Sequence, residues 1–124
     1  MPVAFQQIIP ILRIFDAAKA KEFYVGYLGF TINWEHRFEP ALPLYMEVQR
    51  SDFRIHLTEH HGDACPGANC YVRMTGILEF HAELAARNYG YLRPGVETTE
   101  WNARMMEVID PFGNRIRFSE DIHS

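Results

Sequence analysis

Residues 101–118 show the clearest alternation of hydrophobic and polar positions in the chain. This segment divides into two predicted strands, residues 104–109 and 115–118, on either side of residues 110–114. The intervening sequence Asp-Pro-Phe-Gly-Asn is typical of a tight turn, because Asp starts turns, Pro fixes φ and Gly and Asn tolerate positive φ. We therefore expect a β-hairpin here.

The second strand of this hairpin has two different faces. Ile116 and Phe118 fall on one face, which we expect to be buried, and Arg115 and Arg117 fall on the other. Two cationic side chains on one face indicate solvent or a polar cavity rather than core.

A strand and a helix are predicted at the start of the chain. Residues 3–14 are rich in Ile and Val and predict a strand that is buried on both faces, with a bulge or unpaired edge at Pro10. Asp16 is a candidate N-cap for a helix over residues 17–28, whose apolar positions recur at helical spacing.

Three further strands complete the first half of the chain. Residues 30–38 alternate as a strand, and Trp34 falls on its apolar face, so we expect Trp34 in the core. Residues 44–49 and 53–58 predict a hairpin.

The second half repeats this order of elements. Residues 69–74 predict a strand, 76–87 an amphipathic helix and 92–96 another strand, which precedes the C-terminal hairpin. The chain thus predicts an α+β fold of two βαβββ modules, about residues 1–63 and 68–120.

Composition limits the classes of function. The 124 residues suit a single domain over residues 1–124, and the formal net charge of −4 argues against a nucleic-acid partner. No apolar run approaches the roughly 18 residues of a membrane span. Cys65 and Cys70 lack metal-site spacing and are expected to be reduced thiols, as in a cytoplasmic protein.

Three segments together resemble one known superfamily. They are residues 16–30 (D…A…FY…LGF), residues 56–63 (HLTEHHGD) and residues 101–118 with the turn DPFGN. The chain resembles the glyoxalase/bleomycin-resistance/dioxygenase superfamily, the vicinal-oxygen-chelate fold, and is most similar to its bleomycin-resistance branch. The resemblance implies a curved mixed sheet around a cavity and a homodimer.

The resemblance also implies where a catalytic metal would be held. The four family ligand positions correspond to Ile9, His56, Asn69 (or Cys70 after a one-residue shift) and Arg117. Ile9 cannot ligate a metal, and Arg117 has no lone pair to give and would repel a cation. We therefore expect no metal and no cofactor, and no catalytic residue is assigned.

An unconventional metal site is an open alternative. His36, His56, Glu59 and His60 lie on segments that could be neighbours. With a metal there, the protein would be a lyase, an isomerase or a thiol transferase of the glyoxalase type. A module that works through dimer contacts alone is a third hypothesis.

The favoured function is binding of a small aromatic or chelating compound without catalysis, as the resemblance to bleomycin-resistance proteins implies. Trp101 is expected to be the stacking platform, with core packing as the open alternative, and Glu47 or Glu107 is the expected partner of Arg117 without ligand. The predicted ligand-binding residues are His36, His56, Trp101, Arg104, Arg115 and Arg117. The identity of the ligand and any strand exchange in the dimer are left open.

Overall fold

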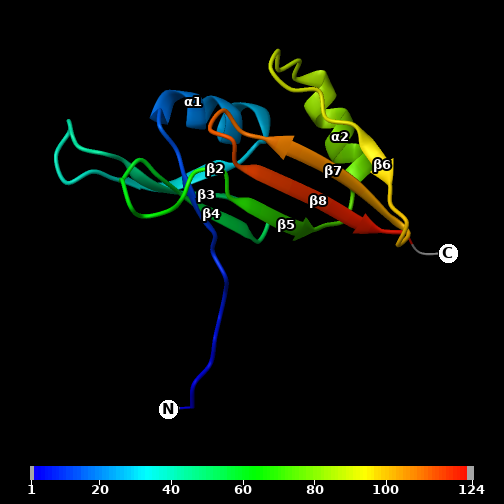
Figure 1. Ribbon diagram of the computed structural model, residues 1–124, viewed down its shortest axis with the longest axis horizontal. Coiled ribbons are helices and arrows are strands. Elements are labelled where there is room, and N and C mark those ends of the chain that lie inside the picture. Colours follow the sequence, from blue (N-terminus) through cyan, green and yellow to red (C-terminus); the bar gives the residue numbers. More distant parts are fainter. Residues whose placement is uncertain (1, 123–124) are drawn as a thin grey trace.

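The computed structural model describes residues 2–122 (Figure 1). The first module contains β1 (Ile11–Arg13), α1 (Ala17–Lys21), the π-helix η1 (Glu22–Tyr27), β2 (Thr31–His36), β3 (Tyr45–Arg50) and β4 (Phe53–Thr58). The second contains β5 (Asn69–Arg73), α2 (Ile77–Ala86), β6 (Val96–Thr98), β7 (Ala103–Ile109) and β8 (Arg115–Asp121). The predicted repeat and the α+β class are confirmed.

Each module forms its own four-stranded sheet with the same topology. The strand orders are β1-β4-β3-β2 and β5-β8-β7-β6. In both sheets the first strand of the module pairs in parallel with the last, and the other neighbours are antiparallel. The repeat is therefore one of topology as well as of element order.

The first helix begins at the predicted cap. The Asp16 carboxylate accepts from the backbone N–H of Lys19 at 3.1 Å, as an N-cap does. After α1 the helix widens into η1, which buries Phe23, Tyr24 and Tyr27. The two tyrosines thus serve helix packing.

One face of each sheet is covered by the helices, and we call the other its open face. Met46 and Val48 of β3 and Ile116 and Phe118 of β8 are buried in one hydrophobic cluster with residues of both helical segments. Alternation along the strands places their neighbours on the open faces. The predicted division between Ile116 and Phe118 on the one side and the arginines of β8 on the other is thus confirmed.

The prediction of a buried strand over residues 3–14 is wrong. Only Ile11–Arg13 forms a strand, and the preceding residues extend away from the molecule as an arm (blue in Figure 1). Phe5 is 99% exposed and Ile8 92% exposed. Pro10 has no N–H to donate, and the ladder with β4 begins at Ile11, where His56 N–H donates to the Pro10 carbonyl at 2.9 Å. The strand expected at residues 92–96 is also displaced, to Val96–Thr98.

Candidate ligand-binding site

A bulge in β2 determines which side chains reach the open face of the first sheet. Ile32 pairs with Val48 and Trp34 pairs with Glu47, so Asn33 is an extra residue in the ladder. Ile32 and Trp34 therefore point to opposite faces, although they are two residues apart. The expectation that Trp34 is a core residue is wrong: it lies on the open face and is 42% exposed.

Aromatic rings form a platform on this face. Trp34 stacks on Tyr45 with the ring planes 7° apart and the centroids 5.9 Å apart. The His56 ring meets Trp34 edge to face, with centroids 5.3 Å apart, and meets Tyr45 in the same way at 5.2 Å. We call these three residues the aromatic platform. Its members come from β2, β3 and β4, so the paired strands fix their relative positions.

A chain of hydrogen bonds fixes the orientation of the Tyr45 and His56 rings of the platform. The Tyr45 hydroxyl lies 2.7 Å from His56 Nδ1, and His56 Nε2 lies 3.0 Å from Glu47 Oε1. An ionised carboxylate can only accept, so Nε2 carries the hydrogen, and in the neutral ring Nδ1 then accepts from the Tyr45 hydroxyl. Asn33 donates to Glu47 Oε2 at 2.7 Å. The hydrogen bonds from Asn33 and His56 lower the pKa of Glu47, so this buried carboxylate stays charged.

The aromatic surface extends past the platform toward the end of β2. His36 pairs with Tyr45 across the strands, which places it on the same open face. Its ring contacts Phe38 edge to face, and Phe38 in turn contacts His60. The structure thus brings the predicted site residues His36 and His56 to one face, on either side of Tyr45.

The open face of the second sheet is cationic. Glu107 accepts from Arg115 Nη1 at 3.0 Å and from Arg117 Nε at 2.9 Å, so one carboxylate serves two guanidinium groups. Glu107 is one of the two partners expected for Arg117; the other, Glu47, is bonded in the first module instead. The Nη groups of Arg117 have no hydrogen-bond partner among residues 2–122 and are free to meet an anionic group.

Two predicted site residues lie apart from these faces. Arg104 pairs with Glu120 and alternates with Met105, so it projects to the helix-covered side and not with Arg117. Trp101 lies in the turn before β7 and is 62% exposed. The platform residue Trp34 was missed because strict alternation hides the bulge. Asn33, a poor strand former in the middle of the strand, was its one signal.

The family's metal positions do not fit a metal ion in this chain. His56 is held between Tyr45 and Glu47, Arg117 is paired with Glu107, and Ile9 has no donor atom. Glu59, a member of the alternative set, accepts from the backbone of Leu44. Across residues 2–122, no three His, Cys, Asp or Glu side chains are grouped so that they could hold a metal.

Two βαβββ units, each with a helix-covered and an open sheet face, define a paired-module α+β protein. The chain belongs to the glyoxalase superfamily, whose family profile, described as glyoxalase superfamily protein, matches residues 1–124. No helix in the described part of the chain is long and apolar enough to cross a membrane.

Bleomycin resistance proteins are among its relatives. The protein of Geobacillus stearothermophilus is 30% identical over 138 aligned residues, which cover 95% of this chain and 98% of the relative. A bleomycin-binding protein crystallised with bleomycin has a TM-score of 0.73 at 25% identity, covering 95% of this chain and all of that one. TnmS3, an antibiotic-binding protein from Streptomyces sp. CB03234, shares the fold, with a TM-score of 0.70 at 22% identity over 98% of this chain and all of its own.

Proposed function

We propose that this protein sequesters a flat aromatic or chelating compound of the bleomycin type without transforming it, and so gives resistance to it. The observation that supports this most is the aromatic platform. Trp34 is exposed, yet it is fixed by stacking on Tyr45 and by its edge-to-face contact with the hydrogen-bonded His56. A preformed aromatic surface loses little conformational freedom when a planar group stacks on it.

The other wall of the site is proposed to come from the second sheet. Arg115 and Arg117 share one carboxylate and retain a net positive charge between them. A ligand with a flat ring system and an acidic or metal-chelating oxygen would suit both faces together. Protection by sequestration requires affinity alone, because a binder in excess at a nanomolar Kd keeps the free compound low.

The binding proposal is tested by titrating metal-free bleomycin while tryptophan fluorescence is recorded. Trp34→Ala is expected to weaken binding by about tenfold or more, as loss of a stacking anchor does. Trp101→Ala is the matched control, because Trp101 is exposed and is the competing platform. The proposal that Trp34 is the stacking anchor is wrong if Trp101→Ala weakens binding and Trp34→Ala does not.

The same titration distinguishes a binder from a metal enzyme. We expect EDTA to leave both the affinity and the melting temperature unchanged within error. An ion bound only to the native state would raise stability by RT ln(1 + [L]/Kd), several kcal/mol at high saturation. A fall of several degrees on chelation would therefore favour the alternative lyase, isomerase or transferase.

We further propose a homodimer, located in the cytoplasm, where the free thiols Cys65 and Cys70 would stay reduced. The apolar side chains Val3, Phe5 and Ile8 of the arm are exposed in the single chain and would be covered by a second copy. Sedimentation equilibrium should give twice the chain mass of 14.5 kDa. Removal of residues 2–8 should weaken the association, and a full-length monomer at micromolar concentration would contradict it.

A further inference from the structure

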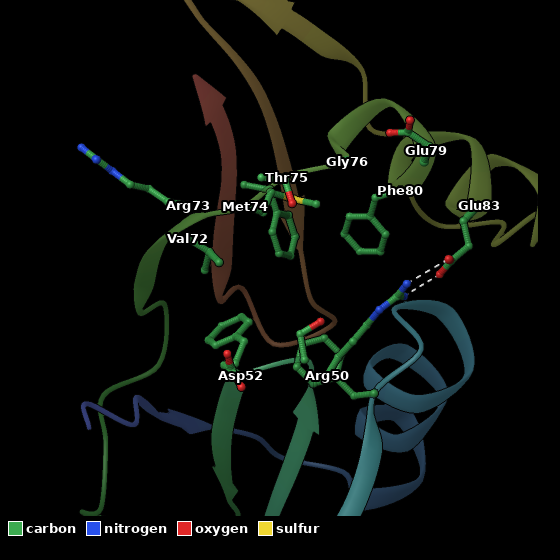
Figure 2. Close-up of a pocket in the computed structure, with 14 residues that line it drawn as sticks. Arg50, Asp52, Val72, Arg73, Met74, Thr75, Gly76, Glu79, Phe80 and Glu83 are labelled. Atoms are coloured by element: carbon green, nitrogen blue, oxygen red, sulfur yellow. Dashed lines mark hydrogen bonds and ion pairs between the residues drawn. The ribbon is translucent and has the colours of Figure 1, made fainter. Parts of the chain in front are cut away.

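A hollow lies between the two modules on the helix-covered side, away from both open faces (Figure 2). It is bounded by the β3–β4 turn, the end of β5 and the start of α2, and its volume is about 560 Å³. This volume is within the range of roughly 300–1,000 Å³ of small-molecule sites. The side chains that give it an apolar wall are Phe30, Phe53, Val72, Met74, Phe80 and Phe118.

The equivalent position in the repeat is filled. There the β7–β8 turn spans five residues, 110–114, and its Phe112 packs on the core and contacts Phe15. The β3–β4 turn has only two residues, Ser51 and Asp52, and supplies no such side chain. The hollow therefore results from a short turn at one of two equivalent junctions.

An ion pair closes one side of the hollow, and its charged groups are already hydrogen-bonded within the protein. Arg50 donates through both Nη atoms to the Glu83 carboxylate and also to the carbonyl oxygen of Leu28 at 2.8 Å. Arg87 lies on the same carboxylate at 2.7 Å. Figure 2 shows the Arg50–Glu83 pair at the edge of the hollow, next to the Phe80 ring. A charged ligand would have to compete with these contacts.

The rim of the hollow carries a carboxylate. The carboxylate of Asp52 makes no hydrogen bond or ion pair with any of residues 2–122. Arg73 and Glu79 also border the hollow, but Figure 2 shows both side chains directed away from it. The hollow thus offers aromatic walls, the exposed carboxylate of Asp52 and the hydroxyl groups of Ser51 and Thr75.

We propose that this hollow is a second binding site, for an uncharged, flat aromatic compound of two or three rings that carries a hydroxyl or N–H donor for Asp52. Four phenylalanine rings favour an aromatic guest by edge-to-face and offset contacts. A net charge would lose its hydration in the hollow without a free partner inside it. An exposed carboxylate such as Asp52 returns little of that cost to a cation.

The test uses 2-naphthol, with 2-naphthoate as its charged match, and methyl NMR of the methionines. Met74 lines the hollow, whereas Met105 lies on the open face of the second sheet, so the two report on different sites. We expect 2-naphthol to shift the Met74 methyl signal saturably and to leave Met105 unchanged. The naphthoate should bind at least about tenfold more weakly, because its charge is not compensated.

Variants locate the site independently of the wild-type spectra. Met74→Trp should fill the hollow and abolish binding, and Asp52→Ala should weaken it about threefold, as loss of an exposed hydrogen bond does. Trp34→Ala, on the open face of the first sheet, is the matched control and should leave the saturable shift of the Met74 methyl signal unchanged. The proposal is overturned if Met105 shifts in place of Met74, if the naphthoate binds equally well, or if 2-naphthol fails to bind up to its solubility limit. Should Met74→Trp fail to fold, the wild-type shifts decide alone.

Discussion

The two junctions between the modules occupy equivalent places in the repeat but are built from different chemistry. At one, the η1 residue Tyr24 donates to Asp110 of the β7–β8 turn at 2.7 Å, and both side chains are buried. At the other, Arg50 at the end of β3 meets Glu83 of α2, and both side chains are about one-third exposed. One junction is closed by a neutral–charged hydrogen bond in the core, the other by an ion pair in contact with water.

The buried junction is the more constrained because Asp110 has many partners. Besides Tyr24, its carboxylate accepts from the backbone N–H groups of Phe112 and Asn114 and from Asn114 Nδ2. Asn114 also donates to the carbonyl of Arg13 in β1 and accepts from Ala68 at the start of β5. A single turn therefore joins strands of both modules. At the ion-pair junction, Arg50 and Arg87 share Glu83 and donate to the carbonyls of Leu28 and Tyr27, but the side chains of these ion pairs are partly exposed and the hollow stays open.

The largest expected effect is that of Asp110→Ala. It leaves the Tyr24 hydroxyl and the backbone N–H groups of Phe112 and Asn114 without their acceptor, so we expect a loss of about 3–4 kcal/mol in the free energy of unfolding. Urea denaturation measures it, with Asp52→Ala in the other turn as the control. The control should change the free energy of unfolding by no more than about 0.5 kcal/mol, as exposed substitutions do. Equal losses in the two variants would show that the junctions do not differ.

Tyr24→Phe should have an intermediate effect, of about 1.5–2 kcal/mol, because it removes a hydrogen bond to a charged group but leaves the ring in place. Burial, and next the charge of Asp110, raise the pKa of Tyr24 well above 10. Below about pH 10 the tyrosine is protonated in both states, and above it only the unfolded chain ionises, so the native wild type loses stability. The difference between wild type and Tyr24→Phe should therefore shrink as pH rises above about 10. If urea melts show a stability difference between wild type and Tyr24→Phe that stays constant up to pH 11, the burial of this hydroxyl is contradicted.

Much of the fold was predictable because its signals are local. The Asp16 cap, the turn at residues 110–114 and the alternation in β8 each specify their own element within a few residues. The arm was mispredicted for a different reason. Its Ile and Val content predicts a strand. Whether such a strand is buried depends on a neighbouring element, however, and within the described chain the N-terminal segment pairs with β4 only from Ile11 onward.

The candidate site was less predictable, because it depends on register and on contacts distant in sequence. The extra residue Asn33 reverses the direction of Trp34, and alternation alone places this side chain in the core. His36 and His56 were predicted, and both lie on the open face. The Tyr24–Asp110 contact joins residues 86 positions apart, and the hollow at Met74 arises from a difference in turn length between two modules. Neither feature has a local pattern.

The smallest of these effects, and the one that tests the weaker junction, is that of Glu83→Gln. The variant removes the carboxylate shared by Arg50 and Arg87, but both pairs are partly exposed, so we expect a loss of only about 1 kcal/mol at neutral pH. The hydrogen bond from Arg50 lowers the pKa of Glu83 below its usual value of 4.5. Its contribution is therefore complete above about pH 4.5 and is lost as pH falls through the lower native pKa. Urea melts from pH 7 to pH 3 should show the difference in stability between wild type and variant becoming smaller at the acid end.

Glu79→Gln is the control, because Glu79 lies one turn earlier on α2 and has no ion pair among residues 2–122. It should change stability by no more than about 0.5 kcal/mol. A loss for Glu83→Gln as large as that for Asp110→Ala, or one independent of pH, would mean that the ion pair holds the modules together as firmly as the buried network does.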